Sequence, residues 1–145
     1  MKIMVLNGPN LNLLGVREPG IYGTVSYAGL LELLEGYAAA HGHELICRQS
    51  NHEGDLVDWI QEARGKCDGI VINPGAYTHT SVALLDAVKA VNLPTVEVHI
   101  SDVDSREPFR QVSYISLGCV RTIKGMGLEG YLEAIRTLEK RGEAQ

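Results

Sequence analysis

The chain has 145 residues, of which 45% are hydrophobic and 21% are charged, as expected of one soluble globular domain with a buried core. Its formal net charge of −5 argues against a general binder of nucleic acids or anionic membranes, although a local group of cations could hold a small anion. We expect a cytoplasmic protein with one domain over residues 1–145, because the three cysteines are scattered and no signal peptide or membrane span is recognisable.

Apolar runs that suit strands alternate along the chain with helical patterns. The runs predict strands at about residues 2–7, 44–49, 70–73, 95–101 and 119–124. Helices are predicted over about 26–40 and 55–66, from about residue 82, and from about residue 127. Ser26 is the expected N-cap of the first helix and Gly42 its stop. Arg121 and Lys124 indicate that the last strand lies at an edge of the sheet.

Five strands alternating with helices predict a doubly wound parallel sheet of the α/β class. At this length the flavodoxin-like strand order 2-1-3-4-5 is the natural arrangement. Residues 70–73 then form the middle strand. Ligands bind at the carboxyl ends of strands in such sheets, so the segments that follow the strands are the candidates for a site.

Residues 8–25 form a long connection that is rich in glycine and proline. Its apolar residues argue against disorder, and we expect a lid that folds over the sheet edge. Tyr22 lies in this lid, five residues after Arg17. A tyrosine hydroxyl, with a pKa of about 10, becomes a useful base only where a cation stabilises the phenolate. Arg17 is placed to do this, although an exposed arginine beside a packed tyrosine is the plainer alternative.

Glu97, His99 and Ser101 alternate along the fourth strand and therefore share one face. A carboxylate on a buried strand needs a partner, and His99 is the nearest candidate. A glutamate beside an imidazole favours the imidazolium and fixes its orientation, which makes His99 a candidate general acid. A buried structural pair remains the alternative.

Asn73 and His79 lie in the turn after the middle strand, and we expect both at a pocket. Arg17, Arg106 and Arg110 fall in loops at the same end of the predicted sheet. Clustered guanidinium groups suit a carboxylate or a phosphate. An ordinary loop with exposed side chains is the alternative for each of these residues.

Three other interpretations compete with an acid–base enzyme. Residues 125–130 match G-x-G-x-x-G, but no strand follows to complete a dinucleotide site, so close helix–strand packing is the preferred explanation. A flavin- or phosphate-binding module would need an anion-cradling loop after the first strand, and residues 10–14 are poor in glycine, serine and threonine. A metal hydrolase would use His79, His99 and Glu97 as ligands.

The motifs along the chain resemble those of the type II 3-dehydroquinate dehydratase family. The matching segments run in order over nearly the whole chain, at residues 7–12, 17–19, 22–23, 48–51, 73–76, 78–81 and 97–101. The resemblance implies a flavodoxin-like subunit, assembled into a dodecamer of trimers. It also implies conversion of 3-dehydroquinate to 3-dehydroshikimate in the shikimate pathway, by elimination of water through an enolate, without a metal or an organic cofactor.

The resemblance also assigns roles to single residues. Tyr22 matches the proton-abstracting base, Arg17 the lid arginine that supports it, His99 the proton donor and Glu97 the residue that orients this donor. Asn10 matches an asparagine that helps to hold a water near the developing enolate. The expected substrate-binding set comprises Asn73, His79, Ile100, Ser101, Arg106, Arg110 and Asp86, the last reaching the site of a neighbouring subunit.

Two segments depart from the family pattern. Gly20 stands where the family often has glutamate, which is expected to alter contacts of the lid. Residues 117–124 are more polar than the usual apolar strand of the family, which bears on the packing of subunits but leaves the expected catalytic residues in place.

Overall fold

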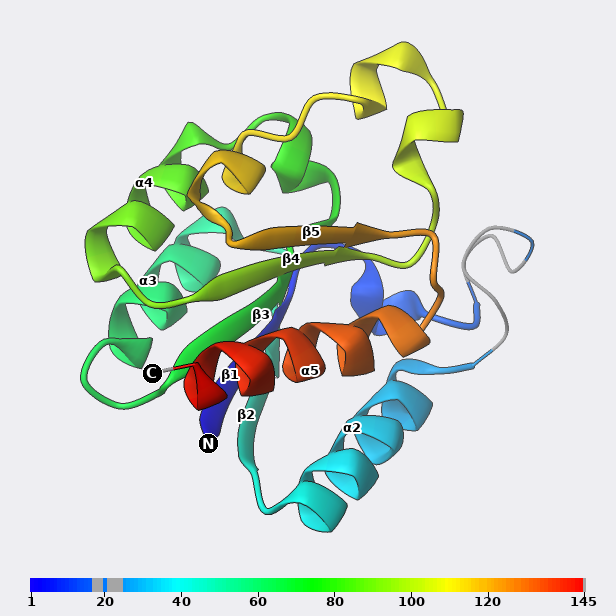
Figure 1. Ribbon diagram of the computed structural model, residues 1–145. Helices are drawn as coiled ribbons and strands as arrows, with labels where there is room; N and C mark the ends of the chain where they lie inside the picture. The colour runs from blue at the N-terminus through cyan, green and yellow to red at the C-terminus, as the bar shows by residue number, and fades with distance from the viewer. Residues whose placement is uncertain (17–19, 21–24, 145) are drawn as a thin grey trace.

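The structure, a computed structural model, describes residues 1–16, 20 and 25–144. The described residues form one parallel sheet of five strands, namely β1 (Lys2–Asn7), β2 (Glu44–Gln49), β3 (Gly69–Asn73), β4 (Thr95–His99) and β5 (Arg121–Lys124). The strand order is β2-β1-β3-β4-β5 (Figure 1), which confirms the predicted flavodoxin-like arrangement and the edge position of the last strand.

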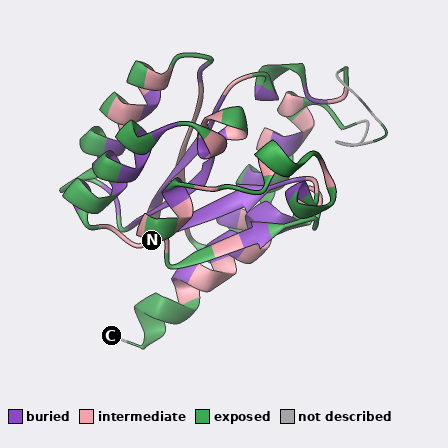
Figure 2. Ribbon diagram, turned by 90° about the horizontal axis from the view of Figure 1, so that it is seen from above, coloured by how far each residue is buried: buried purple, intermediate pink, exposed green. Residues whose placement is uncertain are grey.

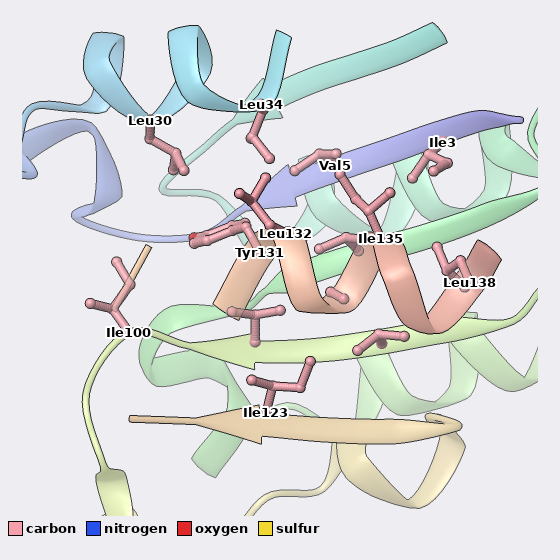
Figure 3. Close-up of a cluster of buried hydrophobic side chains, with 14 of the residues drawn as sticks. Ile3, Val5, Leu30, Leu34, Ile100, Ile123, Tyr131, Leu132, Ile135 and Leu138 are labelled. Carbon is pink, nitrogen blue, oxygen red and sulfur yellow. The ribbon is translucent and has the colours of Figure 1, made fainter. Parts of the chain in front are cut away.

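Helices cover both faces of the sheet (Figure 1). Helices α2 (Tyr27–His41) and α5 (Glu129–Glu143) lie on one face, and α3 (Glu53–Ala63) and α4 (Val82–Val91) lie on the other. Successive strand residues point to opposite faces, so Ile3 and Val5 join the core under α2 and α5 (Figure 3). Met4 and Leu6 join the core under α3 and α4. Exposed residues lie mainly on the outer faces of the helices and in the loops (Figure 2), and Glu44, Arg121 and Lys124 on the two edge strands are exposed as well.

Side-chain caps fix two of these helices where the sequence places them. The Ser26 hydroxyl accepts a hydrogen bond from the Gly29 N–H at 3.1 Å, and α2 ends at Gly42, whose φ is +72°. The Ser81 hydroxyl accepts from the Leu84 N–H at 3.0 Å and so caps α4. Both caps follow from residue types that satisfy the free N–H groups of a helix terminus.

Several predicted boundaries were wrong by a few residues. Strand β4 ends at His99 and not at residue 101, because Ile100 and Ser101 turn toward the loop after β5. Strand β5 begins at Arg121 and not at residue 119, because a 3-10 turn occupies Ile115–Gly118. Helix α3 spans Glu53–Ala63 instead of residues 55–66, and Gly65 follows it with a φ of +74°. A further 3-10 turn, Gly75–His79, precedes α4 and was not predicted.

The glycine motif at residues 125–130 is a packing element, as preferred from the sequence. A Cβ on Gly130 would lie 3.3 Å from Val98 and 3.4 Å from Ile123, so this glycine lets α5 approach the sheet. The Gly125 N–H donates to the Ser101 carbonyl at 3.1 Å and the Gly127 N–H to the Ile100 carbonyl at 3.1 Å. These N–H groups are already bonded to protein, so they are not available to cradle a phosphate.

Among the helices that the structure describes, none combines the length and apolar character that crossing a bilayer requires.

Candidate active site

An open pocket lies at the carboxyl ends of β1, β3 and β4, with about 480 Å³ of space not filled by atoms, part of which is open solvent. The predicted fold placed the segments after these strands next to each other, and they do meet here. The lining residues come from four segments: Pro9, Asn10 and Leu11; Asn73, Gly75, Ala76 and His79; His99, Ile100 and Ser101; and Val103, Arg106 and Arg110.

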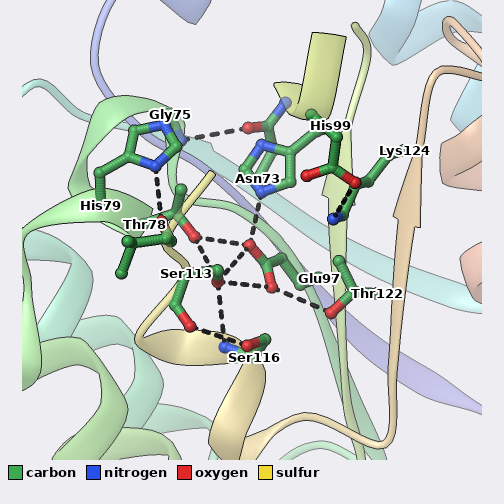
Figure 4. A network of polar contacts seen from close by, with 12 residues as sticks. Asn73, Gly75, Thr78, His79, Glu97, His99, Ser113, Ser116, Thr122 and Lys124 are labelled. Carbon is green, nitrogen blue, oxygen red and sulfur yellow. Dashed lines mark hydrogen bonds and ion pairs between the residues drawn. The ribbon is translucent and has the colours of Figure 1, made fainter. Parts of the chain in front are cut away.

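Asn73 ends the middle strand and is almost fully buried. Its side-chain carbonyl accepts a hydrogen bond from the Gly75 N–H at 3.1 Å, so its amide nitrogen must face the other way (Figure 4). That nitrogen donates to the Tyr131 hydroxyl at 2.9 Å, and the hydroxyl in turn donates to the Asn7 side-chain oxygen at 2.6 Å. The amide group is therefore held in one orientation, and its second hydrogen has no partner among the described residues.

The His79 ring is fixed by a hydrogen bond to the segment that follows Arg110. Its Nδ1 lies 2.7 Å from the Val112 carbonyl oxygen. A carbonyl can only accept, so Nδ1 carries the hydrogen, and Nε2 has no hydrogen-bond partner in the part of the chain that the structure describes. The 3-10 turn Gly75–His79 gives the ring this position at the pocket.

Glu97 and His99 form a close pair on β4. The Glu97 side chain has no exposed area, and its Oε2 lies 2.5 Å from His99 Nε2 (Figure 4). This contact puts the hydrogen on Nε2 and directs that edge of the ring to the carboxylate. His99 itself lines the pocket, whereas Glu97 lies beneath it.

Three hydroxyl groups surround the same carboxylate (Figure 4). Thr78 Oγ1 donates to Glu97 Oε2 at 2.5 Å, Ser113 Oγ donates to both carboxylate oxygens at 3.0 and 2.9 Å, and Thr122 Oγ1 donates to Oε1 at 3.1 Å. Burial raises the pKa of Glu97, but the hydrogen bond and the charge of His99, with the hydroxyl donors, outweigh burial and lower this pKa below its usual value. The buried glutamate is therefore an anion with its oxygens satisfied.

Arg106 and Arg110 reach the pocket from the loop after β4. Their side chains are only 14% and 22% exposed. The Glu107 carboxylate lies 2.7 Å from Arg110 Nε and 4.0 Å from Arg106 Nε. Two partly buried guanidinium groups at one edge of a pocket attract an anionic ligand more strongly than exposed arginines would.

Asn10 sits in a turn with a φ of +70°, a conformation that asparagine tolerates better than most residues. Its N–H donates to the Asn51 side-chain oxygen at 3.0 Å, and the Tyr77 hydroxyl donates to the Asn51 carbonyl at 2.9 Å. Leu11 and Leu14 are buried after this turn, so the beginning of the expected lid is anchored in the core. The predicted base Tyr22 and its neighbour Arg17 lie outside the described residues.

Asp86 does not line this pocket. It lies on the exposed face of α4, and its expected role across a subunit boundary concerns a contact that a single chain does not contain. Sequence reasoning also missed five polar residues beneath the pocket. These residues are Asn7, Thr78, Ser113, Thr122 and Tyr131, and none of them has a regular spacing to the candidate site residues that could have identified it.

The metal-hydrolase alternative is not supported by the geometry. His79 Nδ1 is used by a carbonyl and His99 Nε2 by Glu97. Within residues 1–16, 20 and 25–144, no three side chains of histidine, cysteine, aspartate or glutamate are grouped so that they could hold a metal ion.

Taken together, the fold and the pocket define a flavodoxin-like α/β protein whose pocket holds a histidine paired with a buried glutamate, together with two arginines. The family model described as dehydroquinase class II matches residues 1–139. A curated 3-dehydroquinate dehydratase 2 of Pseudomonas putida is 56% identical over 133 residues, which cover 92% of this chain and 89% of the relative. The 3-dehydroquinate dehydratase of Streptomyces coelicolor is 54% identical over 147 residues, covering 99% of this chain and 94% of the relative.

Solved structures agree with these relatives. The crystal structure of the type II dehydroquinase from Butyrivibrio crossotus superposes with a TM-score of 0.95 at 50% identity, covering 96% of this chain and 97% of that one. The chain belongs to the class II dehydroquinase family.

Proposed function

We propose that this protein catalyses the elimination of water from 3-dehydroquinate to give 3-dehydroshikimate, a step of the shikimate pathway. One observation carries the proposal: the pocket brings His99, backed by an ionised Glu97, together with Asn73, His79 and two arginines. A proton donor beside a binding site for an anion is what this substrate, a β-hydroxy ketone with a carboxylate, requires. Membership of the dehydroquinase family supports the same reaction.

The proposed chemistry is an anti elimination in two steps. Tyr22, assisted by Arg17, removes the proton next to the ketone, and the electron pair of the broken C–H bond forms an enolate. Asn10 helps to hold a water that stabilises the enolate oxygen. The enolate then expels the β-hydroxyl group, which leaves as water with a proton from His99. Solvent returns the proton to His99 and takes one from Tyr22, so the protein is unchanged and neither a metal nor an organic cofactor takes part.

The remaining pocket residues are proposed to bind the substrate. Arg110 and Arg106 attract its carboxylate, and their low exposure supports this role. Asn73 and His79 each have one side-chain group oriented by the protein and another left for a substrate hydroxyl. Ile100 and Ser101 line the pocket directly after His99, and we assign the backbone and side chain there to the same binding set.

A single catalytic domain over residues 1–145 is proposed to work in the cytoplasm as part of a dodecamer built from trimers. Large apolar side chains on the surface support an assembly, among them Val82, Phe109 and Leu117, which are 50%, 66% and 71% exposed. Asp86 is proposed to reach a neighbouring subunit's site. Sedimentation of the protein tests the assembly. Asp86→Ala is expected to weaken substrate binding or assembly. If the variant is unchanged in both, Asp86 is a solvated residue of the helix face without a role in a neighbouring site.

The experiment for the reaction follows ultraviolet absorbance of the conjugated enone product with 3-dehydroquinate in chelator-treated buffer. We expect absorbance to rise with the wild-type protein. In Tyr22→Phe and His99→Ala the rate should fall by about 10²–10⁴-fold each, because each change removes a positioned proton-transfer group. The ring that remains in Tyr22→Phe should leave binding largely intact.

Each result has a clear meaning. No rise from folded wild-type protein would refute the catalytic proposal and favour a binding module. Near-normal turnover in Tyr22→Phe would refute the base assignment, and a mild effect of His99→Ala would move the acid role to His79 or to water.

A further inference from the structure

Residues 112–116, which we call the 112–116 strap, follow directly on the loop that carries Arg106 and Arg110. The strap contacts the pocket at three points. The Val112 carbonyl accepts from His79 Nδ1 at 2.7 Å, the Ser113 hydroxyl donates to Glu97, and the Tyr114 N–H donates to the Thr78 carbonyl at 2.9 Å. One short segment is therefore linked to both histidines of the pocket. It contacts His79 directly, and it contacts Glu97, which in turn contacts His99.

The Ser113 hydroxyl occupies the centre of this arrangement (Figure 4). Its oxygen accepts the Ser116 N–H at 3.2 Å and lies 2.8 Å from Thr78 Oγ1. The same oxygen lies 3.0 and 2.9 Å from the two oxygens of Glu97, so both can share its single hydrogen. A donor shared by both oxygens fixes the plane of the carboxylate, and that plane decides where Oε2 meets His99 Nε2.

We propose that Ser113 is a positioning residue, whose hydroxyl holds the Glu97 carboxylate in the plane that orients His99 and ties this pair to the arginine-bearing loop. The role rests on the proposed function, because it acts through the proton donor of that reaction. It goes beyond that function because it couples the proton donor His99 to the loop whose arginines are proposed to bind the substrate carboxylate. The position of the arginine-bearing loop therefore determines that of the 112–116 strap, and the strap in turn determines the orientation of the His99 ring.

The other donors to Glu97 do not have this role. Thr122 donates to Oε1 alone, at 3.1 Å, from β5. Thr78 belongs to the 3-10 turn that carries His79 and lies on the far side of Glu97 from Thr122 (Figure 4). Thr122→Val is therefore the matched control, since it removes one hydroxyl from the same carboxylate but leaves the 112–116 strap intact.

The test compares Ser113→Ala, Ser113→Thr and Thr122→Val with the wild type by steady-state kinetics and by NMR of ¹⁵N-labelled histidine side chains without substrate. Loss of a general acid costs about 10²–10⁴-fold in rate. In Ser113→Ala the acid His99 is present but wrongly oriented, so kcat should fall by a smaller factor, about 10–30-fold. KM should change by less than about twofold. The His99 and His79 ring resonances should both shift. Ser113→Thr should restore kcat, and Thr122→Val should lower kcat less and leave the His79 resonance in place.

Equal kinetic effects of Ser113→Ala and Thr122→Val, or unshifted His99 resonances in Ser113→Ala, would overturn the proposal. Should Ser113→Ala fail to fold, a folded Ser113→Thr with wild-type kcat and resonances supports it, and a folded Ser113→Thr with low kcat refutes it. The NMR arm needs no substrate. An inactive wild-type protein would therefore refute the proposed function, while the resonances still decide whether Ser113 positions His99.

Discussion

Tyr131→Phe removes one buried hydroxyl group on which two asparagine side chains depend. Tyr131 and Asn7 have no exposed area, and Asn73 is 3% exposed. The hydroxyl accepts from Asn73 Nδ2 at 2.9 Å and donates to Asn7 Oδ1 at 2.6 Å. Asn7 Nδ2 already has no hydrogen-bond partner among the described residues. The variant keeps the ring in the core and leaves two further amide groups unsatisfied.

The expected loss is larger than that of an ordinary hydrogen bond. A buried polar group that loses its partner costs about 1–3 kcal/mol, so two such groups give about 2–6 kcal/mol in the free energy of unfolding. The control is Tyr77→Phe, whose hydroxyl donates to the Asn51 carbonyl in an exposed setting. Water can replace that bond, so the control should lose no more than about 1 kcal/mol.

Urea unfolding, followed by circular dichroism at one fixed protein concentration, measures both losses. A loss in Tyr131→Phe that is no larger than that in Tyr77→Phe would refute the reasoning. It would mean that the two amides find other partners or that water enters the space.

Two other predictions follow from close approach and from burial. A Cβ on Gly8 would lie 2.4 Å from the Pro74 carbonyl oxygen, a backbone atom, whereas one on Gly36 in α2 would meet no described atom within 4 Å. Gly8→Ala should therefore lower the midpoint of urea unfolding and the catalytic rate. The control Gly36→Ala should stabilise the helix by about 0.5–1 kcal/mol. If Gly8→Ala changes neither the midpoint nor the rate, the turn can shift to make room for the methyl group. Burial raises the pKa of Cys47 and of Cys119 to about 12, so at pH 8 only about 10⁻⁴ of each thiol is ionised. Both should react with iodoacetamide far more slowly in the native protein than in urea, and faster only as pH rises toward 12; native rates equal to unfolded rates would contradict this.

The sheet could be predicted from sequence because each strand carries its own signal. The run at residues 70–73 begins with three β-branched apolar residues and is followed by a turn, and the runs at 2–7 and 44–49 were placed to the residue. Strand order then placed Asn73, His79 and His99 at one pocket, since carboxyl ends of parallel strands share an edge.

The groups around Glu97 could not be predicted in the same way. A buried carboxylate must have partners, but Thr78, Ser113 and Thr122 come from three separate segments with no fixed spacing to it. Serine and threonine are also common in turns, so their residue type carries no signal there. Tyr131 has the spacing of a core residue, and only its polar end, visible in the structure, shows a second role.

The strand order also determines when the site can form during folding. Strand β1 pairs with β2 on one side and with β3 on the other, and every neighbouring pair is parallel. No pair can close as a local hairpin, so each pairing brings together residues that are distant in sequence. Asn10 and Arg110 meet only after β1, β3 and β4 have all joined. A ligand of this pocket thus stabilises only chains in which these three strands have paired.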